Sequence, residues 1–288
     1  MKTLRMIVPN GSLWQRLAMY LAIAGYTLRE PDRTGFCGCA NGVEFFQADR
    51  RMIPGFVEVA FDAGITGYDL LLASGIKGLR EVANLCFSRA SDRPSCWVLA
   101  RRKGFRRRGK TVTIACELPR LATILLRRRQ PPFRYRIVRI DGSEELCVKE
   151  RLADMALVVT ESGTSIRANS LEIVPGFENL LASTPRILAR RKLPVAKEEA
   201  LLALSTALFG VVGASDVVML TFDISTDVDI EAISLPSAVA PTVTRLTREG
   251  WNACQTCIPR SAFGRVSMKL KKLDARAIAM QRIEGYLL

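Results

Sequence analysis

A short segment near the middle of the chain carries residue types that bind phosphate. Residues 161–165 are Glu-Ser-Gly-Thr-Ser, which follow the apolar run 156–159 and precede a helical start containing Arg167. Small residues let backbone N–H groups turn toward one point, hydroxyls add donors, and a following helix contributes its positive end. This combination predicts a cradle for a phosphate monoester. An ordinary strand–turn–helix connection with capping hydroxyls is the alternative that the segment alone leaves open.

Positive charge is concentrated in one stretch. The net charge is +14, and residues 101–139 hold fourteen Lys and Arg against one acid, Glu117, which leaves the rest of the chain near +1. Such a field attracts polyanions: nucleic acid, an anionic membrane surface or a phosphate-rich small molecule. A solvated surface that only aids solubility is an equal alternative on charge alone. Few aromatic residues are interleaved (Phe105, Phe133 and Tyr135), which argues against a base-stacking platform.

Composition excludes several other kinds of site. The chain has no histidine, so His-based triads, H-E-x-x-H zinc sites and Cys₂His₂ fingers are excluded. Of the eight cysteines only Cys37/Cys39 and Cys254/Cys257 are close pairs, and a zinc ribbon needs two CxxC knuckles. The single CxxC lies in strand-like sequence, whereas a redox motif opens a helix. We therefore expect reduced thiols in a cytosolic protein.

The elements that must position these residues alternate along the first two thirds. The chain has 288 residues, 49% hydrophobic, which suggests two or three globular domains. No window approaches 18 uninterrupted apolar residues, and the start reaches Pro-Asn-Gly too soon for a signal peptide. The alternation predicts an α/β fold with mainly parallel sheets. Expected strands are 4–8, 43–47, 95–100, 112–115, 136–140 and 156–159, and expected helices include 13–24, 118–129 and 144–152.

The last third has a different pattern. After a helix at 197–212 we expect a strand at 216–223, an acidic turn with a short helix, and strands near 242–246 and 252–258. A helix at 260–273 and a strand at 276–283 follow. Without the leading helix this is the β-α-β-β-α-β order of ferredoxin-like domains.

Segments in the same order along nearly the whole chain resemble the ATP phosphoribosyltransferase family, the first enzyme of histidine biosynthesis, in its long form. The most specific are A-D-M-A-L-V-V-T-E-S-G-T-S-I-R-A-N at 153–169, similar to the family's phosphoribosyl-pyrophosphate loop, and D-A-G-I-T-G-Y-D at 62–69. Others are V-P-N-G-S-L at 8–13, N-G-V-E-F-F at 41–46, I-P at 53–54, I-A-C-E-L-P-R-L at 114–121, D-G-S-E-E at 141–145, and L-P with A-P-T within 235–242.

The resemblance implies a two-lobed α/β catalytic part, like periplasmic binding proteins, followed by a ferredoxin-like (ACT-like) regulatory domain. Lobe I is expected to comprise residues 1–92 plus 168–192, lobe II residues 93–167, and the regulatory domain residues 193–288. The implied activity is glycosyl transfer: N1 of ATP joins phosphoribosyl pyrophosphate, and pyrophosphate leaves with the help of Mg²⁺. N1 carries no proton, so a histidine-free protein can catalyse this step. The basic segment would then attract the two anionic substrates.

The resemblance also implies roles for particular residues. Phosphoribosyl pyrophosphate is expected on the loop, with two acids on the ribose–magnesium side: Glu161, Ser162, Gly163, Thr164, Ser165 and Ile166, with Asp154 and Glu145. ATP is expected beside Gly11, Ser12, Leu13 and Asp69, and no metal ligand is assigned. Histidine as effector is expected near Thr221, Asp223, Ala240 and Thr242. The protein is expected to be a cytoplasmic homo-oligomer, a dimer or hexamer, with no membrane as partner. A nucleic acid bound by the Arg-rich segment is the least favoured alternative.

Departures from the family pattern define the alternatives. The family lysine is missing at Asn10-Gly11, and the second loop acid is Val158. A catalytically weakened relative that acts as a binding or regulatory protein is therefore the alternative function. Ala240 and Thr221 replace a serine and an acid of relatives, so we expect an intact regulatory fold with weak histidine inhibition. A domain retained only for oligomer contacts is the alternative there.

Overall fold

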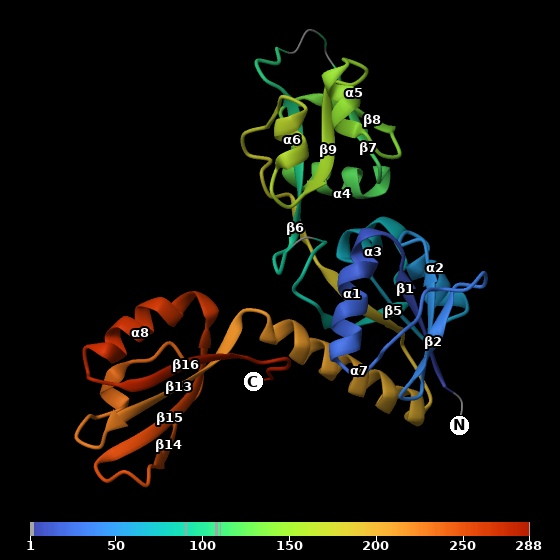
Figure 1. Cartoon of the computed structure of the whole chain (residues 1–288). Helices are drawn as coiled ribbons and strands as arrows, with labels where there is room; N and C mark the ends of the chain where they lie inside the picture. The colour runs from blue at the N-terminus through green and yellow to red at the C-terminus, as the bar shows by residue number, and fades with distance from the viewer. Residues whose placement is uncertain (1–2, 90, 107–108, 110, 288) are drawn as a thin grey trace. The chain divides into compact units, whose positions relative to one another are not determined.

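The computed structural model describes residues 3–89, 91–106, 109 and 111–287 (Figure 1). The chain forms two compact units, residues 1–205 and 206–288. The boundary falls within one helix, α7 (Val195–Ala214). Among the described residues, no helix combines the length and apolarity that crossing a membrane requires.

The first unit contains two six-stranded sheets, as the two-lobed α/β expectation requires. In the first sheet, β1 (Leu4–Pro9), β3 (Val43–Ala48) and β4 (Ala63–Gly67) run parallel. The edges are β2 (Phe36–Ala40) on one side, and β12 (Pro185–Arg190) with β5 (Leu79–Asn84) on the other. Most of β1 is buried, as expected of a central parallel strand. The helices of this lobe are α1 (Ser12–Ile23), α2 (Ile53–Val59) and α3 (Tyr68–Ser74).

The second sheet has the order β10-β6-β9-β7-β8. Its strands β7 (Thr111–Cys116), β8 (Arg134–Arg139) and β9 (Met155–Thr160) are parallel, and β6 (Ser95–Arg102) is antiparallel to β9. One face packs on α4 (Pro119–Arg129) through a core that includes Leu121 and Leu125. The opposite face carries a separate core with Val148 and Ile166, from α5 (Glu144–Lys149) and α6 (Thr164–Ala168).

The lobe boundary differs from the expected one. Both β10 (Leu171–Ile173) and β11 (Leu181–Ser183) pair with β6 and so belong to the second sheet. The chain returns to the first sheet only at β12, which pairs with β4 and β5. The expectation that residues from 168 onward belong to lobe I is therefore wrong for the segment that includes these two strands. Short strands separated by turn residues carry no signal that says which sheet they join.

The second unit has the predicted ferredoxin-like order. Its antiparallel sheet β14-β15-β13-β16 is formed by β13 (Val217–Ser225), β14 (Thr242–Arg245), β15 (Trp251–Pro259) and β16 (Arg276–Arg282). Alternate residues of β13 are buried against α8 (Phe263–Lys271) and its neighbours, while the others lie on the opposite face. The first helix of the pattern is reduced to the single 3₁₀ turn η1 (Glu231–Ile233), and a second 3₁₀ turn, η2 (Arg260–Ala262), leads into α8.

Candidate active site

The carboxyl ends of parallel strands in both lobes line one cleft. In the first lobe these are residues 10–13 after β1, 49–51 after β3 and 67–69 at the end of β4. In the second lobe they are Glu117 after β7, 141–142 after β8 and 160–165 after β9. The pockets lined by these segments share residues and so form one continuous cleft. Ligands of open α/β sheets bind at this end of the strands, where adjacent connections diverge and leave a crevice.

The predicted phosphate loop has a tight hydroxyl cluster. Gly163 has φ +71° and immediately precedes α6, and its N–H donates to Oγ1 of Thr160 at 2.8 Å. The hydroxyls of Ser162 and Thr164 lie 2.7 Å apart, and Arg167 Nη2 reaches Thr164 Oγ1 at 3.4 Å. Hydroxyls, a guanidinium and a left-handed glycine at one turn suit an anionic oxygen group.

Two of the expected loop acids are connected to this end of β9. The Ser165 hydroxyl donates to Glu145 Oε1 at 2.9 Å, which brings α5 to the loop. Glu161 accepts the Arg89 N–H at 3.1 Å and the Ser95 hydroxyl at 3.4 Å, and its carboxylate lies 3.5 Å from Arg89 Nε. Both acids therefore lie where the loop meets its neighbours.

Asp154 and Ile166 do not lie as the ligand assignment expects. Asp154 precedes β9, whereas the loop follows it, so the length of the strand separates them. Its carboxylate accepts the Thr113 N–H at 2.8 Å instead. The assignment of Asp154 to the ribose–magnesium side is therefore wrong. Ile166 is 3% exposed and packs in the core, so it anchors the loop rather than contacting a ligand. Val158, in place of the family acid, packs in that same core.

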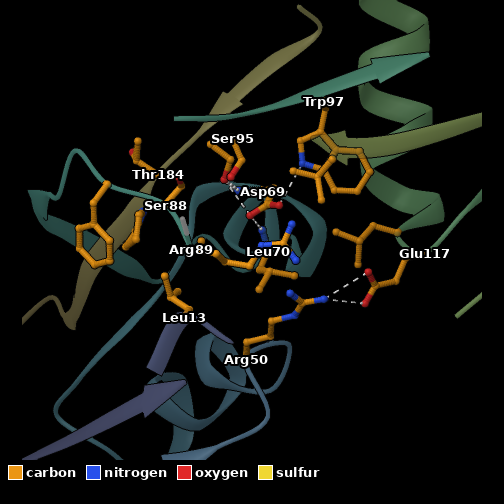
Figure 2. Close-up of a pocket in the computed structure, with 16 residues that line it drawn as sticks. Leu13, Arg50, Asp69, Leu70, Ser88, Arg89, Ser95, Trp97, Glu117 and Thr184 are labelled. Atoms are coloured by element: carbon orange, nitrogen blue, oxygen red, sulfur yellow. Dashed lines mark hydrogen bonds and ion pairs between the residues drawn. The ribbon is translucent and has the colours of Figure 1, made fainter. Parts of the chain in front are cut away.

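The residues expected near ATP are brought to the cleft, but Asp69 is already occupied. Ser12 and Leu13 each line two of the connected pockets. The Asp69 carboxylate accepts the Ser183 hydroxyl at 2.8 Å, Trp97 Nε1 at 2.9 Å and the Leu70 N–H at 3.0 Å (Figure 2). With these donors Asp69 connects the first lobe to β6 and β11 of the second, which is a positioning role.

The cleft also holds charged residues that sequence analysis did not assign. Arg50 Nη2 lies 3.3 and 3.4 Å from the two oxygens of Glu117 (Figure 2). Arg51 Nη1 lies 3.6 Å from both Glu117 and Asp141, and Arg51 hydrogen bonds hold the pKa of Asp49 below its usual range. These ion pairs join the two lobes across the cleft. The sequence signal that could have identified Arg50 and Arg51 is that two adjacent arginines follow the predicted strand 43–47.

Burial raises the pKa of two groups next to the cleft. Burial raises the pKa of the Cys116 thiol to about 12, so Cys116 carries no thiolate at neutral pH and is no nucleophile. Burial also raises the pKa of Glu144, the residue beside Glu145. Among the described residues, no cluster of three or more Cys, Asp or Glu side chains could hold a metal ion unaided.

The basic segment was expected to attract the two substrates, but its described arginines are divided between the two ends of the second sheet. Arg139 is at the cleft end of β8, where its Nε lies 3.2 Å from Asp141. Arg102 and Arg134 instead lie at the other end of the second sheet, because β6 ends and β8 begins there. The direction of the strands thus separates most of this charge from the phosphate loop.

In the second unit, three of the four expected effector residues share one sheet face. Thr221 and Thr242 are both register partners of Gln255, from β13 and β14 on either side of β15. Asp223, two residues beyond Thr221, projects from the same face. Ala240 is exposed in the connection before β14.

The carboxyl ends of parallel strands from both lobes meet at one cleft, and a hydroxyl-rich phosphate loop lies there. These features define a two-lobed α/β protein that binds phosphorylated ligands. Comparison with known proteins identifies which one. The ATP phosphoribosyltransferase family profile matches residues 50–210, and the profile of its C-terminal domain (HisG, C-terminal domain) matches residues 214–285. The chain belongs to the ATP phosphoribosyltransferase family, and so is a glycosyltransferase of histidine biosynthesis.

Individual relatives agree over the full length. The ATP phosphoribosyltransferase of Salinispora tropica is 34% identical, over 98% of this chain and 99% of that one. The ATP phosphoribosyltransferase of Kocuria rhizophila is 31% identical over 98% and 99% of the two chains. Among solved structures, the ATP phosphoribosyl transferase (HisG:HisZ) complex from Thermotoga maritima has a chain with TM-score 0.60 and 22% identity, covering 72% of this chain and 96% of that one. This last likeness supports the fold.

Proposed function

We propose that the cleft joins N1 of ATP to C1 of phosphoribosyl pyrophosphate. The N1–C1 bond forms while the C1–O bond to pyrophosphate breaks, and pyrophosphate leaves with the electron pair. N1 has a free lone pair and no proton to lose. The reaction therefore needs no general base, and a chain without histidine can catalyse it. The residues act by holding two polyanions in line and neutralising the leaving group.

The observation that carries this proposal is the loop between β9 and α6. Its left-handed Gly163 and the adjoining hydroxyls of Ser162 and Thr164 form the receptor for the 5′-phosphate. Glu145, which accepts the Ser165 hydroxyl, is the carboxylate nearest to the ribose side. Asn10–Leu13 and the Arg50–Glu117 pair face the rest of the cleft, where ATP would enter.

The site suits a Mg²⁺ ion that is coordinated mainly by the phosphates of the substrate. The described part of the chain offers no three-ligand cluster of its own. Mg²⁺ commonly binds through one or two carboxylates plus substrate phosphates, and Glu145 is the side chain placed to serve it. When bound, the ion would neutralise charge on the leaving pyrophosphate. Asp154 lies at the wrong end of β9 to take part.

The first test is a coupled pyrophosphate-release assay with ATP, phosphoribosyl pyrophosphate and Mg²⁺, applied to Gly163→Val. The residue has φ +71°, and a Cβ there would lie 3.0 Å from Arg167 Nη1, so a side chain would crowd the guanidinium at the proposed phosphate loop. We expect the KM for phosphoribosyl pyrophosphate to rise about tenfold or more, the equivalent of about 1.4 kcal/mol.

Gly250→Val is the matched control, because Gly250 has φ +76° with nothing within 4 Å of a Cβ and lies in the β14–β15 turn. It carries a similar backbone strain of about 1–3 kcal/mol without touching the cleft. Normal substrate binding by Gly163→Val would refute the loop assignment. No pyrophosphate release by the unmodified chain would favour the catalytically weakened relative.

The proposal extends to cellular context and regulation. A cytoplasmic homo-oligomer, either dimer or hexamer, is consistent with the family. Histidine is proposed as the effector of the second unit, beside Thr221, Asp223 and Thr242 on the shared sheet face. Its carboxylate partner there would be Asp223, and hydroxyl donors would come from the two threonines.

A further inference from the structure

The end of the second sheet opposite the phosphate loop carries a surface of unpaired positive charge. Register places Arg134 beside Thr111, and Arg136 beside Thr113, on β8 and β7. Register also aligns Arg101 of β6 with Met155 of β9, so Arg102 extends the same end of the sheet. Arg151 lines a hollow there together with residues of the β6–β7 connection. We define the basic end as six side chains: Arg102, Lys103, Arg106, Arg134, Arg136 and Arg151.

The three that belong to strands, Arg102, Arg134 and Arg136, lie on one face of the sheet. Arg136 Nε donates to Thr113 Oγ1 at 3.0 Å, and the Thr113 N–H donates to the Asp154 carboxylate at 2.8 Å. Arg102 reaches the Val148 carbonyl at 2.5 Å on α5, which packs on that face. The row Arg102, Asp154, Thr113 and Arg136 therefore crosses four adjacent strands or strand ends.

Almost nothing neutralises this charge. Within the described residues, none of the six cations forms an ion pair within 4.0 Å, and Asp154 is the one acid lining the hollow. Arginines at the cleft end behave differently, because Arg50 and Arg51 pair with Glu117 and Arg89 pairs with Glu161. Five of the six, Lys103, Arg106, Arg134, Arg136 and Arg151, are exposed. The charge is thus available to an external anion, and it is too far along the strands to serve the substrates of the cleft.

We propose that the basic end binds the phosphate backbone of a nucleic acid duplex. Five of its six cations are guanidinium groups, whose planar fork matches two phosphate oxygens at once. Among the described residues that line the hollow, the one aromatic side chain, Phe105, is half-buried, so contacts go to the nucleic acid backbone and not to stacked bases. The described residues that line the hollow come from the end of β6, the β6–β7 connection, the start of β7 and the α5–β9 turn. They include no amphipathic helix, which a membrane-binding surface of this kind uses.

Fluorescence anisotropy with a labelled 20-base-pair duplex and the full chain tests the proposal. We expect saturable binding at low salt, with a slope of log K against log salt of about −4 to −5, from about five neutralised phosphates. Arg106→Ser with Arg134→Ser removes two exposed cations that hold no other described group. This double variant should reduce the slope by about 2 and weaken binding about ten- to hundredfold, while pyrophosphate release is unchanged.

Arg33→Ser with Arg265→Ser is the matched control, because both arginines are exposed, carry the same charge and lie outside the basic end. It should bind the duplex like the unmodified chain.

Equal losses in the two double variants would overturn the proposal, since net charge alone would then explain binding. A dissociation constant above about 100 μM at 50 mM salt would also overturn the proposal. The charges would then serve only to protect the edge strand β8 from pairing with another chain. Arginine-dependent binding to phosphatidylserine vesicles without duplex binding would assign the surface to a membrane instead.

Discussion

At the scale of single residues, the site depends on which polar groups are already satisfied. Asp69 looks like a free ligand in the sequence, yet three donors, including Trp97, hold its carboxylate. Removing one donor would leave a charged group less well satisfied, which is why such networks hold their geometry. The cleft groups with freer oxygens and hydroxyls, such as Ser162 and Thr164, are better placed to meet a ligand.

Burial also sets the reactivity of the thiols. The pKa of Cys37 is raised to about 11 and that of Cys116 to about 12, both by burial, whereas Cys39 and Cys86 are exposed. Because only the thiolate reacts, and a raised pKa keeps the proton on sulfur until the pH approaches it, we expect iodoacetamide at pH 8 to modify Cys39 and Cys86 first. Mass spectrometry of timed digests measures this order.

The same digest after unfolding in guanidinium chloride is the internal control, since all eight cysteines should then react. Modification of native Cys116 as fast as Cys39 would contradict the argument. It would also reopen a nucleophilic role for the thiol immediately before Glu117.

At the scale of elements, α7 begins with two ion pairs to the first sheet's lobe. Lys197 Nζ lies 2.6 Å from Asp62 Oδ2, with both side chains 13% exposed, and Glu198 lies 2.5 Å from Arg80 Nη2. Asp62 Oδ2 also accepts the Arg5 N–H at 2.8 Å. This carboxylate therefore connects β1, the start of β4 and the first turn of α7.

We expect Lys197→Met to lower the free energy of unfolding by about 1–3 kcal/mol, because it leaves the half-buried Asp62 carboxylate with one fewer donor. For a unit of this size that corresponds to a fall in Tm of about 2–10 °C. Differential scanning calorimetry measures it. Lys77→Met is the control, because Lys77 is exposed and its side chain has no ion pair among the described residues. Equal Tm values for the two variants would contradict the proposed connection.

At the scale of the whole molecule, charge is divided between two ends of the second lobe. Acids and arginines pair at the cleft end, while the described cations of the opposite end form no ion pair. The second unit adds a sheet whose open face carries Thr221, Asp223 and Thr242. A binding function for that face would make it a separate ligand site of the same chain.

Calorimetric titration with histidine tests that site. Two missing partners, at Ala240 and Thr221, each cost roughly 1–3 kcal/mol, so we expect binding about thirtyfold to twenty-thousandfold weaker than a fully equipped site would give. Asp223→Asn should weaken it further, because the α-ammonium loses its carboxylate. Micromolar affinity would refute the weakened-site argument. No binding at millimolar histidine would favour a role in oligomer contacts alone.

Local sequence was sufficient for much of this protein. The hydroxyl-rich loop at 161–165, the α/β alternation and the β-α-β-β-α-β order were predicted, because glycine conformation, hydrophobic period and turn residues act over a few positions. The place of Asp154 was also available, since it precedes the predicted strand that the loop follows. The assignment grouped the two by motif and ignored the length of the strand between them.

Only the tertiary structure decided which distant groups meet. Arg51 reaches Glu117, Trp97 reaches Asp69, and β11 joins the second sheet, although nothing near these residues in the chain specifies the partner. Sheet order and strand direction set such contacts, and they arise from the packing of all elements together. Because of these strand directions, Arg102 of β6 and Arg134 of β8 lie away from the cleft. They form a basic surface that is separate from the site.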